Sequence, residues 1–485
     1  MKPSGAFVCL VLLAGANQIH CAEPPKNSGR QTKPVEGCSL LISDELMEKD
    51  KAATERALEL LTVQLQEIKR VVPEAAVAEL IKVPLWFSPE YPGVPQRAEY
   101  HFPFNRKQLA KHDPEMTELL NKLWRCSADE SAAAKAETNP DNQLPRPDGK
   151  PADQTKAVKV YIMLGQSNML GFGRVGPKET KGSLEFMVKE KGKYPHLVDD
   201  EGHWTTRQDV RYVHVMDQRG GDYKDMDKFG DVRNEWLTPN KSFGPELGFG
   251  HVIGQFHDEP VLLLKACIGN RSLGWDLLPP GSERFEFEGK VYAGYKDVAN
   301  FWDKGTEPKP VPWYAGRQYD ADTAHAKAVL KNLEKYYPGY KGQGYEVAGF
   351  VWWQGHKDQS AALASRYEQN LVRLIKTLRT DFNAPNAKFV LATGCGNPGR
   401  EGFGLQIAQA QLAVDGDNGK HPDFKGNVKA VDTRDLWREA DVSPVNQGYH
   451  YNHNAETYYE VGATLGRAMK ALLSNAGRDV QQGSK

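Results

Sequence analysis

From Val158 onward the chain alternates short apolar runs with amphipathic helical patterns, and this alternation constrains the fold more than any other feature. The runs are rich in Val, Ile, Leu and Ala, which is typical of strands that are buried on both faces of a sheet. Alternation of this kind predicts a parallel α/β sheet with right-handed crossovers, whose functional residues gather at the carboxyl ends of the strands. We expect strands at 158–164, 260–268, 347–353, 388–395 and 428–433, and helices at roughly 246–256, 323–337, 364–382, 403–414 and 454–473.

The region before this alternation divides into three segments by composition. Residues 1–22 begin with a basic residue and an apolar run too short to span a bilayer, a pattern that predicts a signal peptide and a secreted or periplasmic protein. Residues 37–126 carry the patterns of a small α+β unit, to which we assign no chemistry. Residues 127–155 are polar and rich in Ala and Pro, the composition of a linker. Catalysis is therefore expected in residues 156–475.

The charge balance excludes two classes of partner. With 62 basic and 63 acidic side chains, the chain lacks the excess of cations that binding to nucleic acid or to an anionic membrane surface requires. Beyond the N-terminus no stretch reaches the roughly 18 continuous apolar residues of a membrane span. A small neutral or polar substrate fits this composition better.

Residues 175–240 interrupt the alternation with a charged segment that has little periodicity. We expect an insertion of loops, which either shape a binding site or decorate the surface.

The strongest chemical signal is a serine directly after the first expected strand. The strand ends at Leu164, and the turn that follows sets Ser167 at the carboxyl edge of the sheet. There a hydroxyl can face a cleft while backbone N–H groups stabilise developing negative charge. The chain has no GxSxG motif, so the nucleophile elbow of the α/β-hydrolases is not the pattern. By spacing alone, a serine that merely caps a helix is the favoured interpretation.

Four sequence blocks, in order, resemble the sialate O-acetylesterase/acetylxylan esterase family, a branch of the SGNH hydrolases. The blocks are 165–169 (GQSNM), 243–246 (FGPE), 349–355 (GFVWWQG) and 449–452 (YHYN). The resemblance covers roughly residues 155–475. It implies a three-layer α/β fold with a parallel, flavodoxin-like sheet, preceded here by the small N-terminal α+β unit.

The resemblance also implies the chemistry of a serine esterase acting on acetylated carbohydrates. Ser167 would attack the acetyl carbonyl, and His450 would take its proton and later protonate the departing sugar hydroxyl. The oxyanion would be held by the backbone N–H groups of Ser167 and Gly244 and by the side-chain amide of Gln354. Water would then hydrolyse the acetyl-enzyme, with neither metal nor cofactor.

Two departures from the family pattern leave the orienting acid open. Gln447 stands where the family has an aspartate three residues before the histidine, and His356 stands where it has a glutamate. Asp441 is the first candidate for the acid, because it precedes His450 on the same expected loop, and Asp358 is its rival. A Ser–His dyad, with a backbone carbonyl fixing the tautomer of the imidazole, is the third option.

A metal site built from His356, His450 and His453 is the less favoured reading of these histidines. No Asp, Glu or Cys stands at matched spacing, and the six cysteines lack the pattern of a metal site. His453 is expected beside Asn454, the predicted N-cap of the last helix.

Tryptophans add a weaker indication of a sugar pocket. Trp275, Trp302 and Trp313 fall in the loops after the second expected strand, and one of Trp352 and Trp353 is expected to line the pocket. For any single one of them, an ordinary core position is the favoured interpretation.

Two other functions are consistent with the sequence. One is a carbohydrate-binding pseudoenzyme that kept Ser167 but lost turnover with its carboxylate. The other is an esterase that acts on lipid or other non-sugar acyl esters.

Overall fold

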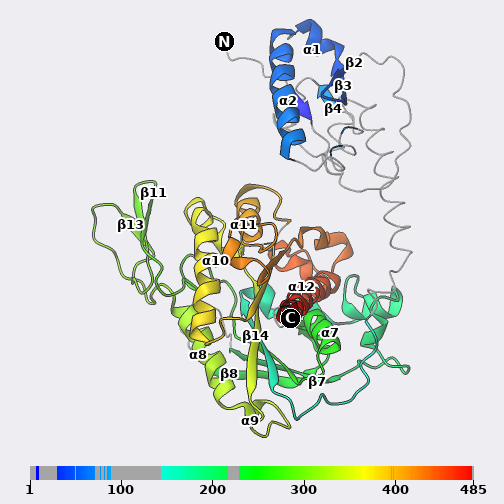
Figure 1. Ribbon diagram of the computed structural model, residues 1–485, viewed down its shortest axis with the longest axis vertical. Helices are drawn as coiled ribbons and strands as arrows, with labels where there is room; N and C mark the ends of the chain where they lie inside the picture. The colour runs from blue at the N-terminus through cyan, green and yellow to red at the C-terminus, as the bar shows by residue number, and fades with distance from the viewer. Residues whose placement is uncertain are drawn as a thin grey trace. The chain divides into compact units, whose positions relative to one another are not determined.

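The structure, a computed structural model, divides into two units, Met1–Thr138 and Asn139–Lys485 (Figure 1). The boundary falls inside the segment expected to be a linker. Among the described residues, no helix combines the length and the apolar character needed to cross a membrane. The described residues are 7–9, 30–49, 51–71, 77, 81, 85–88, 144–216, 229–394, 396 and 398–482.

The described part of the first unit is a four-stranded sheet with one long helix. The strand order is β1-β4-β3-β2. Leu58, Leu61 and Leu65 share one face of helix α2, and they form an apolar core with residues of β3 such as Leu40 and Ile42. The elements are β1 (Phe7–Cys9), β2 (Arg30–Val35), β3 (Cys38–Ser43), α1 (Asp44–Lys49), α2 (Lys51–Val71) and β4 (Leu85–Ser88).

The second unit is built around a seven-stranded sheet in the order β16-β15-β14-β5-β10-β7-β8. Every neighbouring pair is parallel except β7 with β8. All five expected strands are present, so the predicted parallel α/β sheet is confirmed. The strands are β5 (Val158–Gly165), β7 (Arg207–Met216), β8 (Phe229–Leu237), β10 (Val261–Lys265), β14 (Tyr345–Trp353), β15 (Lys388–Ala392) and β16 (Val428–Val431).

Strands β7 and β8 correct the expectation that residues 175–240 form only loops. Strand β7 contains charged residues, and these obscured its apolar alternation. The charges are tolerated because they are paired: Arg207 contacts Asp209, and Arg211 Nη2 donates to the side-chain oxygen of Asn234 on β8 at 2.7 Å.

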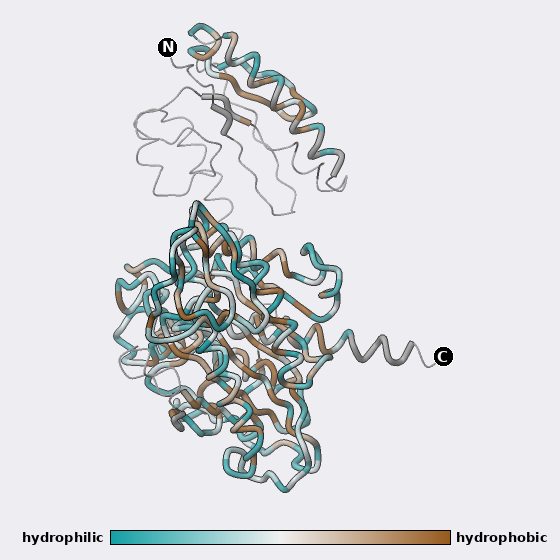
Figure 2. The backbone as a smooth tube through the Cα atoms, turned by 90° about the vertical axis from the view of Figure 1, so that its left-hand side faces the viewer, coloured by the Kyte–Doolittle hydropathy of each residue, from teal (hydrophilic) through white to brown (hydrophobic). Residues whose placement is uncertain are grey.

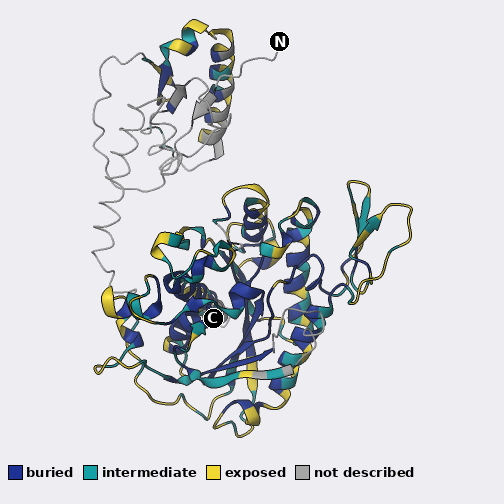
Figure 3. Ribbon diagram, turned by 180° about the vertical axis from the view of Figure 1, so that it is seen from behind, coloured by how far each residue is buried: buried dark blue, intermediate teal, exposed yellow. Residues whose placement is uncertain are grey.

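Helices cover both faces of the sheet, which makes a three-layer structure (Figure 1). One apolar core packs α8, α9, α10 and α11 against the sheet, and a second packs α7 and α12 against the other face. Figure 2 shows apolar stretches running through the interior of this unit, and Figure 3 shows that the central strands of the seven-stranded sheet are largely buried. The helices are α7 (Glu246–Phe256), α8 (Arg317–Lys331), α9 (Leu333–Tyr336), α10 (Ala361–Asp381), α11 (Gly402–Ala413) and α12 (Ala455–Gln482).

Short elements decorate this framework. Helix α6 follows β5 directly and precedes a two-stranded sheet of β6 and β9. A separate three-stranded sheet in the order β11-β12-β13 lies between β10 and α8 in the chain. The elements are α6 (Ser167–Leu170), β6 (Gly173–Arg174), β9 (Ser242–Phe243), β11 (Phe285–Phe287), β12 (Lys290–Tyr292) and β13 (Phe301–Asp303).

Candidate active site

Ser167 begins helix α6 at the carboxyl end of the central strand β5, and its side chain is largely buried. The turn before it passes very close to β14: the backbone N–H of Gln166 donates to the carbonyl oxygen of Trp353 at 3.3 Å. A Cβ on Gly165 would lie 2.3 Å from the same oxygen, so the turn requires glycine. The serine is thus fixed at the sheet edge, where parallel α/β folds place their sites.

The turn that carries Ser167 is joined to the loop that carries His450. Asn168 Nδ2 donates to the carbonyl oxygen of Tyr449 at 3.3 Å. The hydroxyl of Tyr458, on helix α12, contacts Asn168 Oδ1 at 2.8 Å and the carbonyl oxygen of His450 at 3.2 Å. The two predicted catalytic residues therefore lie next to one shared set of hydrogen bonds. Within the described residues, Ser167 Oγ itself makes no hydrogen bond to the imidazole.

The imidazole of His450 lies between an aromatic ring and an amide. The ring of Phe172 stacks on it with centroids 3.7 Å apart and planes within 11°. Nδ1 lies 3.1 Å from Gln447 Oε1, and Nε2 of His453 lies 2.5 Å from the same oxygen. Burial lowers the pKa of His450 to about 4, and the charges of His453 and His356 add to the effect. The imidazole is therefore neutral near pH 7, as a general base must be.

The backbone directly after His450 is strained. Tyr451, Asn452 and His453 have φ values of 49°, 54° and 56°, in the left-handed region that costs roughly 1 kcal/mol or more per residue. Hydrogen bonds hold the turn: Asn452 Oδ1 accepts from the N–H of Gln447 at 2.9 Å, and Asn452 Nδ2 donates to the carbonyl oxygen of Arg438 at 2.9 Å.

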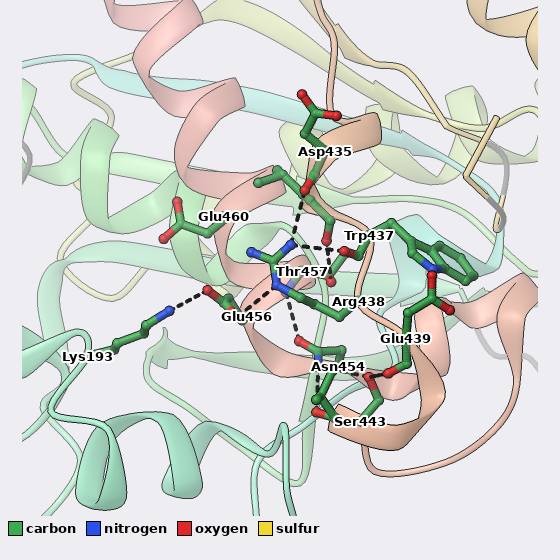
Figure 4. Close-up of polar contacts among 12 residues, drawn as sticks. Lys193, Asp435, Trp437, Arg438, Glu439, Ser443, Asn454, Glu456, Thr457 and Glu460 are labelled. Atoms are coloured by element: carbon green, nitrogen blue, oxygen red, sulfur yellow. Dashed lines mark hydrogen bonds and ion pairs between the residues drawn. The ribbon is translucent and has the colours of Figure 1, made fainter. Parts of the chain in front are cut away.

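The first turn of α12 anchors the same loop (Figure 4). Glu456 pairs with Arg438 at 3.0 Å and with Lys193 at 2.5 Å, so it joins the loop before His450 to the segment before β7. Asn454 Oδ1 accepts from the N–H of Thr457 at 3.2 Å, which confirms the predicted N-cap. The loop is thus held at both of its ends.

Gln447 makes the contact with the imidazole that was expected of an acid. Asp441 lies exposed on a short 3-10 helix, Ala440–Val442, and makes no hydrogen bond to His450. No carboxylate among the described residues hydrogen-bonds the ring of His450. The available sequence indication was the position of Gln447, three residues before the histidine, where the family pattern has an aspartate.

Gly244 is joined to helix α6 by a buried ion pair. Its N–H donates to Glu246 Oε1 at 2.9 Å, and Glu246 Oε2 lies 2.5 Å from Lys265 Nζ. Lys265 Nζ also donates to the carbonyl oxygen of Leu170 at 3.1 Å. Both charged side chains are buried. The expected oxyanion donor at Gly244 therefore already has an internal acceptor.

Gln354, at the carboxyl end of β14, is also internally paired. Its Nε2 donates to the carbonyl oxygen of Arg271 at 2.9 Å and to Asp358 Oδ2 at 2.6 Å. Asp358 accepts two further bonds of 2.8 Å, from the N–H groups of Leu273 and Gly274. Burial raises the pKa of Asp358 to about 6. This network fixes the loop after β10, and it does not bring Asp358 to the imidazole of His450.

The predicted aromatic residues are mostly structural. Trp352 and Trp353 are both fully buried, on opposite faces of the sheet, which corrects the expectation that one lines a pocket. Trp275 and Trp313 contact each other in a small separate core. Trp302 lies under the guanidinium of Arg284, 5.1 Å from its ring centroid.

The three-layer fold places Ser167 after its central strand and His450 before its last helix. The chain belongs to the family described as carbohydrate esterase, sialic acid-specific acetylesterase, whose model matches residues 157–471. Family membership supports the assignment of a carbohydrate acetylesterase and confirms the predicted relationship.

Three solved structures are among those similar to the chain. A protein from Arabidopsis thaliana is 17% identical, with 65% of this chain and 98% of that one covered and a TM-score of 0.35. A carbohydrate acetylesterase from Xanthomonas citri is 12% identical, with 65% and 56% covered and a TM-score of 0.37. NanS is 12% identical, with 67% and 98% covered and a TM-score of 0.36. No curated protein matches the sequence.

Proposed function

We propose that this protein is an exported serine esterase that removes O-acetyl groups from carbohydrates through an acetyl-enzyme. Ser167 is the nucleophile and His450 is its base. The observation that carries the proposal is the set of hydrogen bonds through Asn168, which holds the serine turn against the histidine loop. A neutral, partly buried imidazole on a loop that is hydrogen-bonded to the turn of a serine at the sheet edge is suited to general-base catalysis.

The course of the reaction depends on which ring nitrogen of His450 is available to accept a proton. Nδ1 is engaged by Gln447, so Nε2 takes the proton of Ser167 as Oγ attacks the acetyl carbon. The tetrahedral intermediate collapses, the bond to the sugar oxygen breaks, and His450 returns the proton to that oxygen. A water molecule then attacks the acetyl carbon with His450 again as base, and acetate leaves with Ser167 regenerated.

The oxyanion requires N–H donors near Ser167. The N–H of Ser167 is at the first position of α6, where helix geometry provides no intrahelical acceptor. Gly244 and Gln354 are the other proposed donors, and each has to exchange an internal acceptor for the oxyanion when substrate binds. Losing one such donor typically costs about 3–4 kcal/mol of transition-state stabilisation.

The acid of a full triad is the least supported part of the proposal. Asp441 would reach His450 only after a rearrangement of the loop that carries both residues. Asp358 already accepts three hydrogen bonds elsewhere.

Hydrolysis of 4-nitrophenyl acetate and of O-acetylated sialic acid by the purified protein tests the proposal. Ser167→Ala is expected to abolish release of acetate from both substrates, whereas Ser474→Ala, a serine on α12 away from the site, is expected to leave it unchanged. Binding of the sugar without hydrolysis by the wild-type protein would indicate a pseudoenzyme. Faster hydrolysis of 4-nitrophenyl butyrate than of the acetate would indicate a lipid or general acyl esterase.

A further inference from the structure

We propose that Gln447 is the positioning residue of the catalytic base, and that its neutral amide oxygen does the orienting for which the family pattern uses an aspartate. The inference rests on the proposed role of His450. It identifies the group that fixes the orientation and the tautomer of the imidazole, and it explains how the site can function without a carboxylate at Nδ1.

The hydrogen-bonding capacity of the amide fixes the tautomer. An amide oxygen only accepts, so the contact of 3.1 Å between Gln447 Oε1 and His450 Nδ1 requires the proton to be on Nδ1. Nε2 then carries the lone pair that can accept the proton of Ser167. The opposite orientation of the amide would present an N–H to Nδ1, and His450 would then hold its proton on Nε2 and could not act as the base.

Two neighbours set the orientation of the amide. His453 Nε2 lies 2.5 Å from Gln447 Oε1, so the oxygen receives two donors and both of its lone pairs are used. Gln447 Nε2 donates to the hydroxyl of Tyr449. The amide of Gln447 therefore contacts three side chains: the imidazole of His450, the imidazole of His453 and the phenol of Tyr449.

The backbone of Gln447 is held independently of its side chain. Its carbonyl oxygen accepts from the N–H groups of His450 at 2.9 Å and Asn452 at 3.1 Å, and its own N–H donates to Asn452 Oδ1. A substitution at Gln447 therefore removes the amide while these bonds still define the turn.

The charges around His450 show what an amide changes. The rings of His453 and Tyr449 lie beside the imidazole on its own segment, and Phe172 stacks on one face. Burial lowers the pKa of His450, and the charges of His453 and of His356, which follows β14, lower it further. Burial and the charge of Arg174 lower the pKa of His453 in the same way. The histidines and Arg174 are neutral or cationic, and Gln447 is neutral, so among the described residues no carboxylate hydrogen-bonds the ring to offset the positive charge of a protonated His450. A carboxylate at this position would favour the charged imidazole.

A pair of variants separates the two roles of the side chain. Gln447→Leu removes the acceptor and is expected to lower kcat on 4-nitrophenyl acetate by roughly tenfold or more, with KM within about twofold, because the tautomer is no longer selected. Gln447→Glu restores an acceptor with a charge, so it is expected to keep activity and to move the acid limb of kcat/KM upward by about one pH unit. Gln255→Leu, an exposed glutamine on α7, is the matched control and is expected to behave as wild type.

Either of two kinetic results would overturn the inference: a Gln447→Leu variant as active as wild type, or a Gln447→Glu variant whose acid limb coincides with the wild-type limb. Circular dichroism at each pH identifies a variant that has failed to fold, and Gln447→Glu then provides the decisive comparison.

Nitrogen NMR of ¹⁵N-histidine-labelled protein tests the same idea without turnover. The resonance of His450, identified by its loss in His450→Gln, is expected to report a proton on Nδ1 at pH 7.5 in the wild type and a changed tautomer ratio in Gln447→Leu. A proton on Nε2 in the wild type, or the same ratio in both proteins, contradicts the role of Gln447. If Ser167→Ala proves as active as wild type, the proposed function fails, and the tautomer result still decides what Gln447 does.

Discussion

The side-chain amide of Asn168 donates to the carbonyl oxygen of Tyr449 at 3.3 Å, so the residue after the proposed nucleophile holds the residue before the proposed base. The hydroxyl of Tyr458 supports both partners from helix α12. Packing of α12 on the sheet and the geometry of the site are therefore linked through one phenol.

Replacing Tyr458 by Phe tests this link. The ring stays in the core, but buried Asn168 Oδ1 loses its donor, which costs about 1–3 kcal/mol. We expect a lower melting temperature and a several-fold fall in kcat. Tyr459→Phe is the matched control, because its hydroxyl contacts His196 at 2.6 Å instead of the site, and it should lower stability without the fall in kcat. Equal kcat in both variants would contradict the link.

The buried pair of Lys265 and Glu246 predicts a strong effect on stability. Lys265→Met leaves Glu246 buried without its cation, and breaking such a pair typically costs about 3–5 kcal/mol. Urea denaturation should show this loss, and the double variant Lys265→Met, Glu246→Gln should recover much of it. A single variant as stable as wild type would show that the pair contributes nothing.

The ring of Phe172 is expected to control the pKa of His450. Phe172→Ala exposes the imidazole, and because burial is the main cause of its lowered pKa, the pKa should rise from about 4 towards the ordinary value. The acid limb of kcat/KM should move to higher pH by a unit or more. Phe172→Leu keeps the imidazole covered and should shift the limb less. Identical limbs in the wild-type and Ala proteins would refute this account.

Buried histidines predict that acid destabilises the fold. Burial lowers the pKa of His196 to about 4 and that of His214 to about 3. Between these values and about pH 6.5 the unfolded chain binds more protons than the folded one, so this stability is complete above about pH 6.5 and is lost as the pH falls towards 4 and 3.

Urea denaturation at pH 7.5 and pH 5 measures the effect. The midpoint should fall on acidification, and it should fall less in His214→Gln. His203→Gln, which removes an exposed histidine, should follow the wild type. A midpoint that is constant over this range would exclude the mechanism. Kinetic profiles in acid therefore need a parallel measurement of folding.

The sequence predicts the parallel sheet well, because most of its strands are nearly continuous runs of apolar residues. Strand β7 was not predicted, because Arg207 and Arg211 are charged residues that are typical of loops. Their burial in a strand is possible because Asp209 and Asn234 accept hydrogen bonds from the two guanidinium groups. Ser167 and His450 were predicted from motifs that resemble those of the family, and their roles stay predictions.

The contact of Asn168 was not predictable, because it joins two segments that are 281 residues apart in the sequence. Gln447 stands only three residues before His450, but the sequence alone does not show that its amide oxygen faces the ring. A neutral amide also lacks the charge by which an orienting acid is usually recognised. The internal acceptors of Gly244 and Gln354 stand only two and four residues further along the chain, but the sequence does not show that the side chains of Glu246 and Asp358 turn back onto these donors.

The left-handed stretch Tyr451–His453 makes this loop an unusual target for protein engineering. Glycine at Tyr451 would relieve unfavourable backbone energy, but it would also delete a ring that packs against Trp353 and widen the range of conformations open to the neighbouring base. Removing a buried aromatic ring typically costs about 3–5 kcal/mol, more than the strain that glycine would relieve, so stability and turnover both favour the tyrosine at this position.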